Sequence, residues 1–513
     1  MSPADQRFWS MLFAAMMLWS YPAAAAADCD SPQDPEAAII DCTQSINSGK
    51  WKGRYLAAFY SNRAAAYRAT GDSDRAMADL NEAIRLDPKL AMAFNNRGAA
   101  YNEQGDNDRA IADYNEAIRI DPKLAMAFSN RGNAYSDKGD NDRAIADFNQ
   151  AIRLDPSLAR AFQNRGSAYH DKGDNDRAIA NYNEAIRLEP KHAKAFIGRG
   201  IAFSDKGDSD RAVADFSEAI RLDPKDAMAF DHRGSAYHDK GDNDRAIADY
   251  NEAIRLNPKS GMAFHNRGVA YLEKGDTDRA IADYSEAIRI DPEDASTYTN
   301  RAAAYHAKGD NDRASADLNE AIRLDPESGK AFVGRGDVFS SRGDLERAIA
   351  DYNEAIRLNP KSPLPYFARG RSYLFAGSVE KALADFNQAS AQAPENAYLA
   401  LWVDIAGRRN NLPSRLAQTS SRIDMTVWPA PVVRLFMDQT TPAAVLAAAD
   451  DPDATKKKGQ VCEANFYSGE LSLTKGLKDE ASRLFRLAAS DCPHSFTEWD
   501  AANAELKALG VIP

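Results

Sequence analysis

A pattern of large apolar, small and polar residues returns every 34 residues over most of this chain. In the copy that runs from Ala91 to Pro122, Phe94, Tyr101 and Tyr114 lie among small residues at spacings that bring them to one face of a helix. Gly105 separates two such stretches and is typical of a helix end. Each copy therefore predicts two short helices joined by a tight turn.

One arginine marks the phase of the copies, because it recurs at intervals of 34 residues without an insertion. The marked positions are Arg63, Arg97, Arg131, Arg165, Arg199, Arg233, Arg267, Arg301, Arg335 and Arg369. Ten units thus run in register over residues 57–396. Gly98 and Ala110 are the small residues that let paired helices approach closely. One unit cannot bury its aromatic residues alone, so stacking of neighbouring units predicts an all-α solenoid.

The repeated residues resemble the tetratricopeptide repeat (TPR) family, whose pattern is W-x2-L-G-x2-Y, A-x3-F and P over 34 residues. Ten copies cover 340 of the 513 residues. The resemblance implies a TPR solenoid, a superhelix of stacked antiparallel helix pairs, with an irregular helical C-terminal region. Phe or Tyr replaces the family's Trp, and arginine replaces its Leu. We expect the stem of this arginine to pack and its guanidinium to reach solvent or a neighbouring carboxylate.

The first residues, 1–27, differ from the rest of the chain. After a single arginine, an apolar run extends from Phe8 to Trp19, and five alanines end at Ala27. This pattern is typical of a secretory signal peptide, and the run is too short to span a bilayer as a helix. We expect cleavage after Ala27 and a periplasmic or secreted product, with a retained N-terminal anchor as the alternative. A lipid anchor on Cys29 is disfavoured, because Asp28 stands where the lipoprotein pattern requires Gly or Ala.

All four cysteines lie outside the ten regular units, and four cysteines allow three pairings. In phase with the repeat, Cys29 takes the position of Arg63 and Cys42 that of Ala76, where the two helices of a TPR hairpin touch. We therefore expect a disulfide-bonded half-repeat over residues 28–56, in an oxidising compartment. The predicted pairs are Cys29–Cys42 and Cys462–Cys492. Four free, buried thiols are the alternative.

The repeat register fades after Pro394. Residues 397–461 predict an irregular helical segment, and residues 462–513 predict a degenerate TPR unit with a closing helix. The strings WPAPVVRLF and CEANFYSGE, together with the export signal, resemble TPR proteins of the bacterial envelope. That group includes NlpI-like lipoproteins, which serve as adaptors for proteases and peptidoglycan hydrolases. An apolar cluster is expected to pack under Trp402 and the tail: Leu364, Phe367, Leu374 and Phe375.

Charge and motifs offer little support for chemistry. The chain has 64 basic and 76 acidic residues, for a net charge of −12, which disfavours nucleic acid as a partner. The sequence has no Gly-rich phosphate loop, G-x-S-x-G, H-E-x-x-H or C-x-x-C, so we expect no cofactor, no metal and no catalytic residue. His170, His238 and His306 share a unit position but lie two repeats apart, too far for one metal ion. Cys462, with His494 near Cys492, is the one candidate nucleophile, and a disulfide is favoured over it.

The leading prediction is a non-catalytic scaffold or adaptor of the bacterial cell envelope that binds a protein or peptide along its concave TPR surface. The alternative is an enzyme, or enzyme subunit, with its site in residues 397–513 and repeats that recruit substrate. A buried nucleophile or carboxylate pair with a shifted pKa, in a pocket of that tail, would favour the alternative. Self-association through the ends is a third interpretation.

In TPR proteins the first helix of each unit lines the concave face, which implies a binding role for the positions of Met92, Asn95, Ala99, Asn102 and Glu103. None of the residues at the Asn95 position is the lysine that clamps a C-terminal carboxylate, so recognition of that kind is disfavoured. The Glu103 position is acidic in six successive units: Glu103, Asp137, Asp171, Asp205, Asp239 and Glu273. Adaptable apolar contacts are expected from Met92, Met126, Ile197, Ile201, Met228 and Met262. We predict an acidic track for an extended basic segment, with duplication of one ancestral unit as the alternative explanation of the row.

Overall fold

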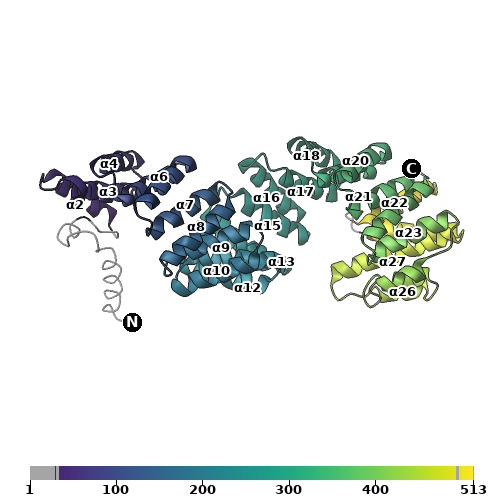
Figure 1. Cartoon of the computed structure of the whole chain (residues 1–513). Helices are drawn as coiled ribbons and strands as arrows, with labels where there is room; N and C mark the ends of the chain where they lie inside the picture. Colours follow the sequence, from purple (N-terminus) through teal and green to yellow (C-terminus); the bar gives the residue numbers. More distant parts are fainter. Residues whose placement is uncertain (1–28, 30–33, 493–495, 512–513) are drawn as a thin grey trace. The chain divides into compact units, whose positions relative to one another are not determined.

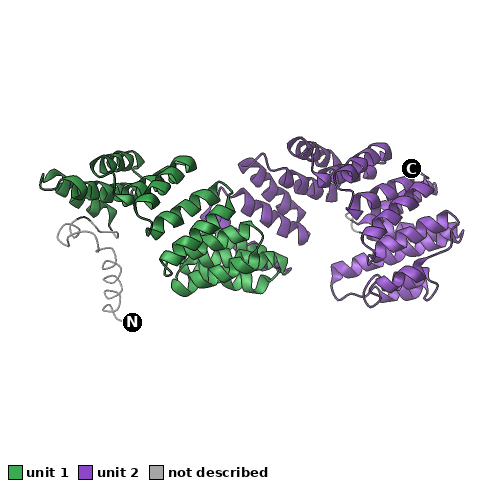
Figure 2. Cartoon of the chain, in the orientation of Figure 1, with its two compact units in different colours: residues 1–240 green, residues 241–513 purple. Residues whose placement is uncertain are grey.

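The computed structural model describes Cys29, residues 34–492 and residues 496–511, so the predicted signal peptide over residues 1–27 and His494 lie outside the described residues. Within the described part, every regular element is a helix, which confirms the predicted all-α fold (Figure 1). The chain divides into two compact units, residues 1–240 and residues 241–513 (Figure 2). Each unit is described by itself below.

Unit 1 begins with α2 (Pro35–Asn47) and continues as alternating first and second helices of the repeat. Its first helices are α3 (Gly53–Ala69), α5 (Ala91–Glu103), α7 (Ala125–Asp137), α9 (Ala159–Asp171), α11 (Ala193–Asp205) and α13 (Ala227–Asp239). Its second helices are α4 (Ser73–Leu86), α6 (Asn107–Ile120), α8 (Asn141–Leu154), α10 (Asn175–Leu188) and α12 (Ser209–Leu222).

Unit 2 continues the alternation with second helices α14 (Asn243–Leu256), α16 (Thr277–Ile290), α18 (Asn311–Leu324), α20 (Leu345–Leu358) and α22 (Val379–Gln392). Its first helices are α15 (Gly261–Glu273), α17 (Ala295–Ala307), α19 (Gly329–Ser341) and α21 (Pro363–Phe375). The tail adds α23 (Ala397–Arg409), α24 (Leu416–Thr419), the 3₁₀ turn η1 (Ser420–Arg422), α25 (Ala430–Phe436), α26 (Pro442–Ala448), α27 (Ala454–Thr474), α28 (Lys478–Asp491) and α29 (Thr497–Ala508).

Two adjacent residues form the turn between the two helices of each 34-residue repeat. Gly105 has a φ of 79°, a left-handed conformation that glycine adopts without steric cost, and it ends α5. Asp106 then accepts a hydrogen bond from the backbone N–H of Arg109 at 3.0 Å and caps α6. The same glycine and aspartate recur in the following copies as far as Gly343 and Asp344, so these repeats share one turn, whereas Ser378 follows Gly377 in the last regular copy.

The paired helices touch where a small residue faces a large one. A Cβ added to Gly98 would lie 2.8 Å from Cε1 of Tyr114, so only glycine fits beside this ring. The unit that carries Ala302 at this position carries the smaller Leu318 opposite it, and both side chains are buried. The size of one residue is therefore matched to the size of its partner.

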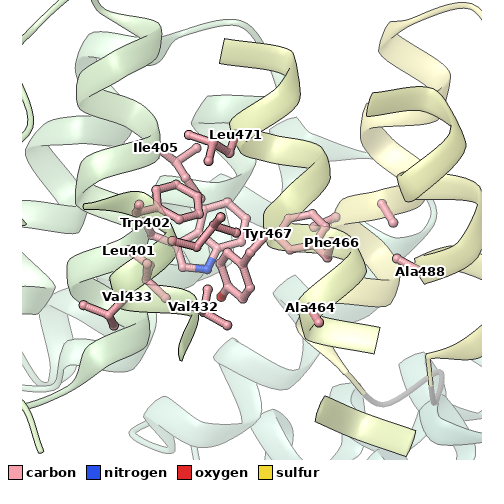
Figure 3. Close-up of a cluster of buried hydrophobic side chains, with 14 of the residues drawn as sticks. Leu401, Trp402, Ile405, Val432, Val433, Ala464, Phe466, Tyr467, Leu471 and Ala488 are labelled. Atoms are coloured by element: carbon pink, nitrogen blue, oxygen red, sulfur yellow. The ribbon is translucent and has the colours of Figure 1, made fainter. Parts of the chain in front are cut away.

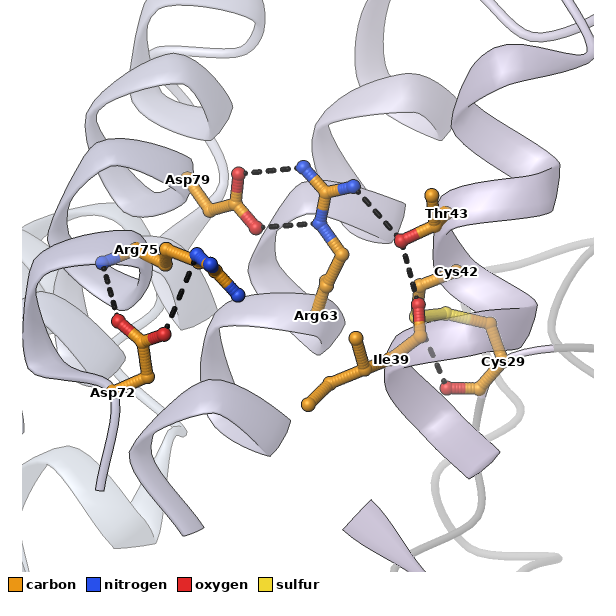
Figure 4. A network of polar contacts seen from close by, with 8 residues as sticks. All are labelled: Cys29, Ile39, Cys42, Thr43, Arg63, Asp72, Arg75 and Asp79. Atoms are coloured by element: carbon orange, nitrogen blue, oxygen red, sulfur yellow. Dashed lines mark hydrogen bonds and ion pairs between the residues drawn. A yellow bond between two sulfur atoms is a disulfide. The ribbon is translucent and has the colours of Figure 1, made fainter. Parts of the chain in front are cut away.

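The marker arginines Arg63 and Arg97 each form a partly buried ion pair with the second helix of their own repeat and a further hydrogen bond to the preceding repeat, so the guanidinium reaches a neighbouring carboxylate as expected. Arg63 donates from Nε and Nη2 to the two carboxylate oxygens of Asp79, at 2.7 and 2.8 Å, and from Nη1 to Thr43 Oγ1 of α2 at 3.0 Å (Figure 4). In the next unit Arg97 binds Asp113 in the same way, and its Nη1 donates to Asn81 of the preceding second helix at 2.9 Å. The hydrogen bonds from each arginine thus connect its own second helix to the preceding repeat.

The cysteines pair as predicted. A disulfide joins Cys29 to Cys42 of α2, with a Cα–Cα distance of 4.9 Å (Figure 4). These two residues form a small apolar cluster with Phe59, against which Trp51 packs. At the other end, a disulfide joins Cys462 of α27 to Cys492, with a Cα–Cα distance of 5.0 Å.

The tail has a hydrophobic core in which aromatic residues from several helices meet (Figure 3). Trp402 is buried and lies 5.8 Å, ring centre to ring centre, from both Phe367 and Phe466. Phe367 and Leu374 pack here as predicted, whereas Leu364 is 55% exposed. The structure differs from the sequence pattern at α27, which begins at Ala454 and not near Cys462, because Asp453 caps the helix by accepting hydrogen bonds from two backbone N–H groups.

Candidate functional site

The predicted acidic positions lie at the C-terminal ends of successive first helices. In unit 1 the exposed residues Glu103, Asp137, Asp171, Asp205 and Asp239 end α5, α7, α9, α11 and α13. We call these five residues the acidic row. Glu273 takes the same place at the end of α15 in unit 2 and is also exposed. A carboxylate in the last turn opposes the helix dipole by about 0.3–1 kcal/mol, so the row does not stabilise the helices that carry it.

Part of the acidic row also connects neighbouring repeats. The preceding first helix contributes a donor to three of its members: Arg68 to Glu103 at 2.5 Å, Asn102 to Asp137 at 2.8 Å and His170 to Asp205 at 2.7 Å. These contacts compensate some of the charge while the carboxylates stay exposed to solvent. The row therefore has a structural role beside any role in binding.

The predicted apolar contacts differ in accessibility. Met126 and Met228 are 39% and 64% exposed in unit 1, and Met262 is 66% exposed in unit 2, whereas Met92 is half-buried. Ile197 and Ile201 are also half-buried, because they pack against the cluster of Phe203, Phe216 and Ala236. The exposed apolar surface thus comes from methionine, whose flexible side chain adapts to different partners.

The Asn95 position faces the next repeat and not solvent. Asn95 is 2% exposed, and its Oδ1 accepts a hydrogen bond from Nδ2 of Asn130 at 3.0 Å. Asn96 in turn donates to Ser61 Oγ at 3.3 Å. The following first helix thus covers Asn95, which the structure places between two repeats and away from the expected binding surface.

The three histidines that share a unit position lie on separate first helices. His170 contacts Asp205, and His306 Nδ1 lies 2.7 Å from Asn311 Oδ1. The described part of the chain contains no group of three or more His, Cys, Asp or Glu residues placed to hold a metal ion. Within these described residues, no helix is both long enough and apolar enough to cross a membrane.

A pocket of about 460 Å³ lies in unit 2, between the last regular first helix and the tail. Its walls are apolar and aromatic, with Phe367 from α21, Tyr398 and Trp402 from α23, and Phe496 before α29. Two carboxyl groups complete the lining, Glu463 of α27 and Glu498 of α29. We call this cavity the tail pocket.

Both carboxyl groups of the tail pocket are buried, and neutral donors hold them in place. Glu463 Oε2 accepts hydrogen bonds from the Tyr398 hydroxyl at 2.8 Å and from Trp428 Nε1 at 2.7 Å. Glu498 Oε1 accepts one from the Tyr467 hydroxyl at 3.0 Å. Burial and the nearby charge of Glu498 raise the pKa of Glu463 to about 7, although both of its hydrogen bonds act in the opposite direction. Burial also raises the pKa of Glu498.

The sequence analysis did not single out these carboxyl groups. The observable signal is the string CEANFYSGE, in which Glu463 and Glu470 interrupt a run of residues that the structure buries almost completely. Acidic residues in such a run are rarely buried without a partner. The position of Glu498 on α29 gives no such signal, because α29 has an ordinary mixed composition.

Family models of the tetratricopeptide repeat match this chain over most of its regular units. The model described as TPR repeat matches residues 64–105, 99–139, 132–173, 234–275, 270–309 and 336–375. Two models described as tetratricopeptide repeat match residues 164–227 and 295–328. The matches together extend over residues 64–227, 234–328 and 336–375, which is more than half of the chain.

Solved structures of TPR proteins are also similar. A tetratricopeptide repeat protein from Parabacteroides merdae ATCC 43184 is 21% identical over 48% of this chain and 97% of that chain, with a TM-score of 0.39. YrrB, described as a TPR protein with an unusual peptide-binding site, is 26% identical over 38% of this chain and 97% of that chain, with a TM-score of 0.32. PilF of Pseudomonas aeruginosa is 17% identical over 40% and 93%, with a TM-score of 0.37. On the matched repeats, the chain belongs to the tetratricopeptide repeat family.

Proposed function

We propose that this protein is a non-catalytic scaffold that binds a protein or peptide partner along the first helices of its repeats. TPR repeats typically mediate protein–protein and protein–peptide interactions, and membership of the family supports this role. The observation that carries the proposal is the acidic row, five exposed carboxylates on successive first helices of unit 1. Exposed methionines at the opposite ends of the same first helices, such as Met126 and Met228, add adaptable apolar contacts.

The row favours a partner of a particular chemistry. Regularly repeated carboxylates attract an extended segment with several lysines or arginines, and such attraction weakens as salt screens it. The partner is therefore expected to be a basic, extended segment of a protein.

The test reverses the charge of four of the five residues of the row in the full-length mature protein. Changing Asp137, Asp171, Asp205 and Asp239 to lysine should abolish capture of a basic peptide and the salt dependence of that capture. The matched control reverses four acids of second helices that pair only with a surface arginine: Glu82, Glu116, Glu184 and Glu218. Both variants change the net charge equally. Equal binding by both variants at low and high salt would show that the row takes no part in binding.

We also propose an exported protein of the bacterial envelope. Support comes from the signal-like sequence of residues 1–27 and from two disulfides, which persist in oxidising compartments. Sequencing the N-terminus of the protein recovered from cells should give Asp28 as the first residue. A mature chain that starts at Met1, or a fatty-acylated Cys29, would contradict this proposal.

A second candidate function is that of an enzyme with its site in the tail, which is the alternative interpretation of the sequence. Its favouring observation is the tail pocket, where Glu463 has a pKa of about 7 beside the second buried carboxyl group of Glu498. Such a group can act as a general acid or base at neutral pH. Turnover of a glycoside or peptide substrate that is lost in both Glu463→Gln and Glu498→Gln would favour this candidate over the scaffold.

A further inference from the structure

Helices α27 and α29 of the tail each carry two buried glutamates, and these form two pairs with one glutamate from each helix. On α27 the residues are Glu463 and Glu470, seven positions apart, and on α29 they are Glu498 and Glu505, also seven positions apart. Seven residues make about two helical turns, so each helix presents both of its glutamates on one side. The pairs Glu463–Glu498 and Glu470–Glu505 therefore have equivalent positions on the two helices.

The chain itself provides a cation for one of these pairs. Arg409 of α23 is hydrogen-bonded and ion-paired through Nη2 to Glu470 Oε2 at 2.6 Å and to Glu505 Oε1 at 2.9 Å. Burial alone would lower the pKa of Arg409, but the two carboxylates raise it. A guanidinium between two buried carboxylates is the arrangement that offsets the cost of desolvating them.

No described residue serves as such a cation for the other pair. Among the described residues, neither Glu463 nor Glu498 forms an ion pair, and their hydrogen-bond donors are the neutral Tyr398, Trp428 and Tyr467. The positive charge of Arg371 in α21 favours the ionised form of Glu498, although burial raises the pKa of this group overall. The Arg371 guanidinium lies over the Phe367 ring of its own helix, 5.3 Å from the ring centre. Its Nη2 also lies 3.9 Å from Oδ1 of Asp337 in α19, so Arg371 is already ion-paired with another helix.

Glu463 and Glu498 both line the tail pocket, whereas Glu470 and Glu505 are not part of its wall. The tail pocket has aromatic walls from Phe367, Tyr398 and Trp402, and its volume of about 460 Å³ is sufficient for a long side chain with part of its backbone. Aromatic faces attract cations, and apolar walls accept a methylene stem. The pocket therefore combines a site for a positive charge with a site for an apolar chain.

We propose that the tail pocket binds a guanidinium or ammonium group on an apolar stem, which takes the place between Glu463 and Glu498 that Arg409 takes between Glu470 and Glu505. The cation comes from an arginine or lysine side chain of the partner or from a free polyamine. This inference rests on the proposed scaffold function, since it gives one basic side chain of the partner a defined site. It uses different residues from the acidic row.

The experiment measures binding of two tripeptides to the mature protein by calorimetry and tryptophan fluorescence at pH 8. Acetyl-Gly-Arg-Gly-amide carries the cation, and acetyl-Gly-citrulline-Gly-amide is its neutral analogue of the same shape. The arginine peptide should bind at least tenfold more tightly, and Glu463→Gln or Glu498→Gln should remove that preference. Glu480→Gln is the matched control, because Glu480 lies exposed on α28 and pairs only with Arg483. Equal affinity for both peptides, or an unchanged preference in the pocket variants, would overturn the proposal.

Three further measurements keep the result unambiguous. If a glutamine variant fails to fold, Leu364→Lys tests the same site from its exposed rim, where a fixed lysine should compete with the ligand and weaken binding tenfold. Spermidine binding with the same dependence on Glu463, without binding of the tripeptide, would assign the pocket to free polyamines. Reversal of the acidic row should leave tripeptide binding unchanged, so failure of the row and failure of the pocket are separate results.

Discussion

At the scale of single residues, the repeat that contains Arg165 lacks the aspartate that pairs with the marker arginine in the adjacent repeats. In unit 1 the marker arginines Arg97, Arg131 and Arg199 each bind an aspartate, but Arg165 faces Asn181 and donates to its Oδ1 at 2.7 Å. Burial accordingly lowers the pKa of Arg165, whereas pairing with Asp147 raises that of Arg131. A neutral partner compensates the buried guanidinium less well than a carboxylate does.

We therefore predict that Asn181→Asp stabilises the protein. The new carboxylate would complete the bidentate pair seen in the adjacent repeats, for a gain of roughly 0.5–2 kcal/mol in the free energy of unfolding. Urea unfolding followed by far-UV circular dichroism measures this gain. The reverse change in the preceding repeat, Asp147→Asn, should cost a similar amount, and a loss of stability in Asn181→Asp would contradict the prediction.

The buried carboxyl group of Glu463 predicts a dependence of stability on pH. Its pKa is about 7 in the folded protein against an ordinary value of 4.5, so between these values the folded protein holds more protons than the unfolded chain. Stability should accordingly fall as pH rises from 4.5 through 7. Glu463→Gln removes this contribution and should be more stable than the wild type at pH 8 by up to roughly 3 kcal/mol, with no gain at pH 4. Thermal unfolding of both proteins at pH 4 and pH 8 measures this difference in stability. A gain in stability at pH 4 as large as that at pH 8 would exclude titration of Glu463 as its cause.

At the scale of the helix pair, packing depends on matched sizes. A Cβ on Gly132 would lie 2.7 Å from Cε1 of Phe148, so Gly132→Ala should destabilise unit 1 by about 1–3 kcal/mol. Ala302 and Leu318 show that the fold accepts the opposite combination. The double variant Gly132→Ala with Phe148→Leu should recover most of the loss, which a double-mutant cycle measured by urea unfolding would show as strong coupling. Additive effects of the two changes would exclude a direct size match.

The sequence contains the information for these helix pairs but little of that for the tail. The recurrence of Gly98, Gly105 and Tyr114 predicts helices, turns and close contacts, because each repeat solves the same local packing problem. The phase of the repeat also places Cys29 beside Cys42. By contrast, the tail pocket joins Phe367, Glu463 and Glu498 from helices that are far apart in sequence. No periodicity relates such positions, so the pair of carboxyl groups becomes visible only in three dimensions.

At the scale of the whole molecule, the regular repeats and the tail are stabilised in different ways. Each repeat packs mainly on its neighbours, so the stability of the array is a sum of local terms. The tail instead buries one shared aromatic core around Trp402 and is crosslinked by Cys462–Cys492. The tryptophans of the described chain report on these parts unequally, since Trp402, Trp428 and Trp499 lie in the tail and Trp51 lies before the first repeat.

We predict that tryptophan fluorescence and far-UV circular dichroism give different unfolding curves. In a Trp51→Phe variant of the chain from Asp28 onwards, which lacks Trp9 and Trp19, fluorescence follows only the tail. Circular dichroism follows mainly the helices of the repeats, whose long array departs from two-state unfolding. The fluorescence transition in urea should therefore be single and sharp, and the dichroism transition broad with a different midpoint. Asn181→Asp, which lies in unit 1, serves as the internal control: it should shift the dichroism curve and leave the fluorescence curve in place, because stability in the array is transmitted mainly between adjacent repeats. Coincident curves that shift together would instead show that the repeats and the tail unfold as one cooperative body.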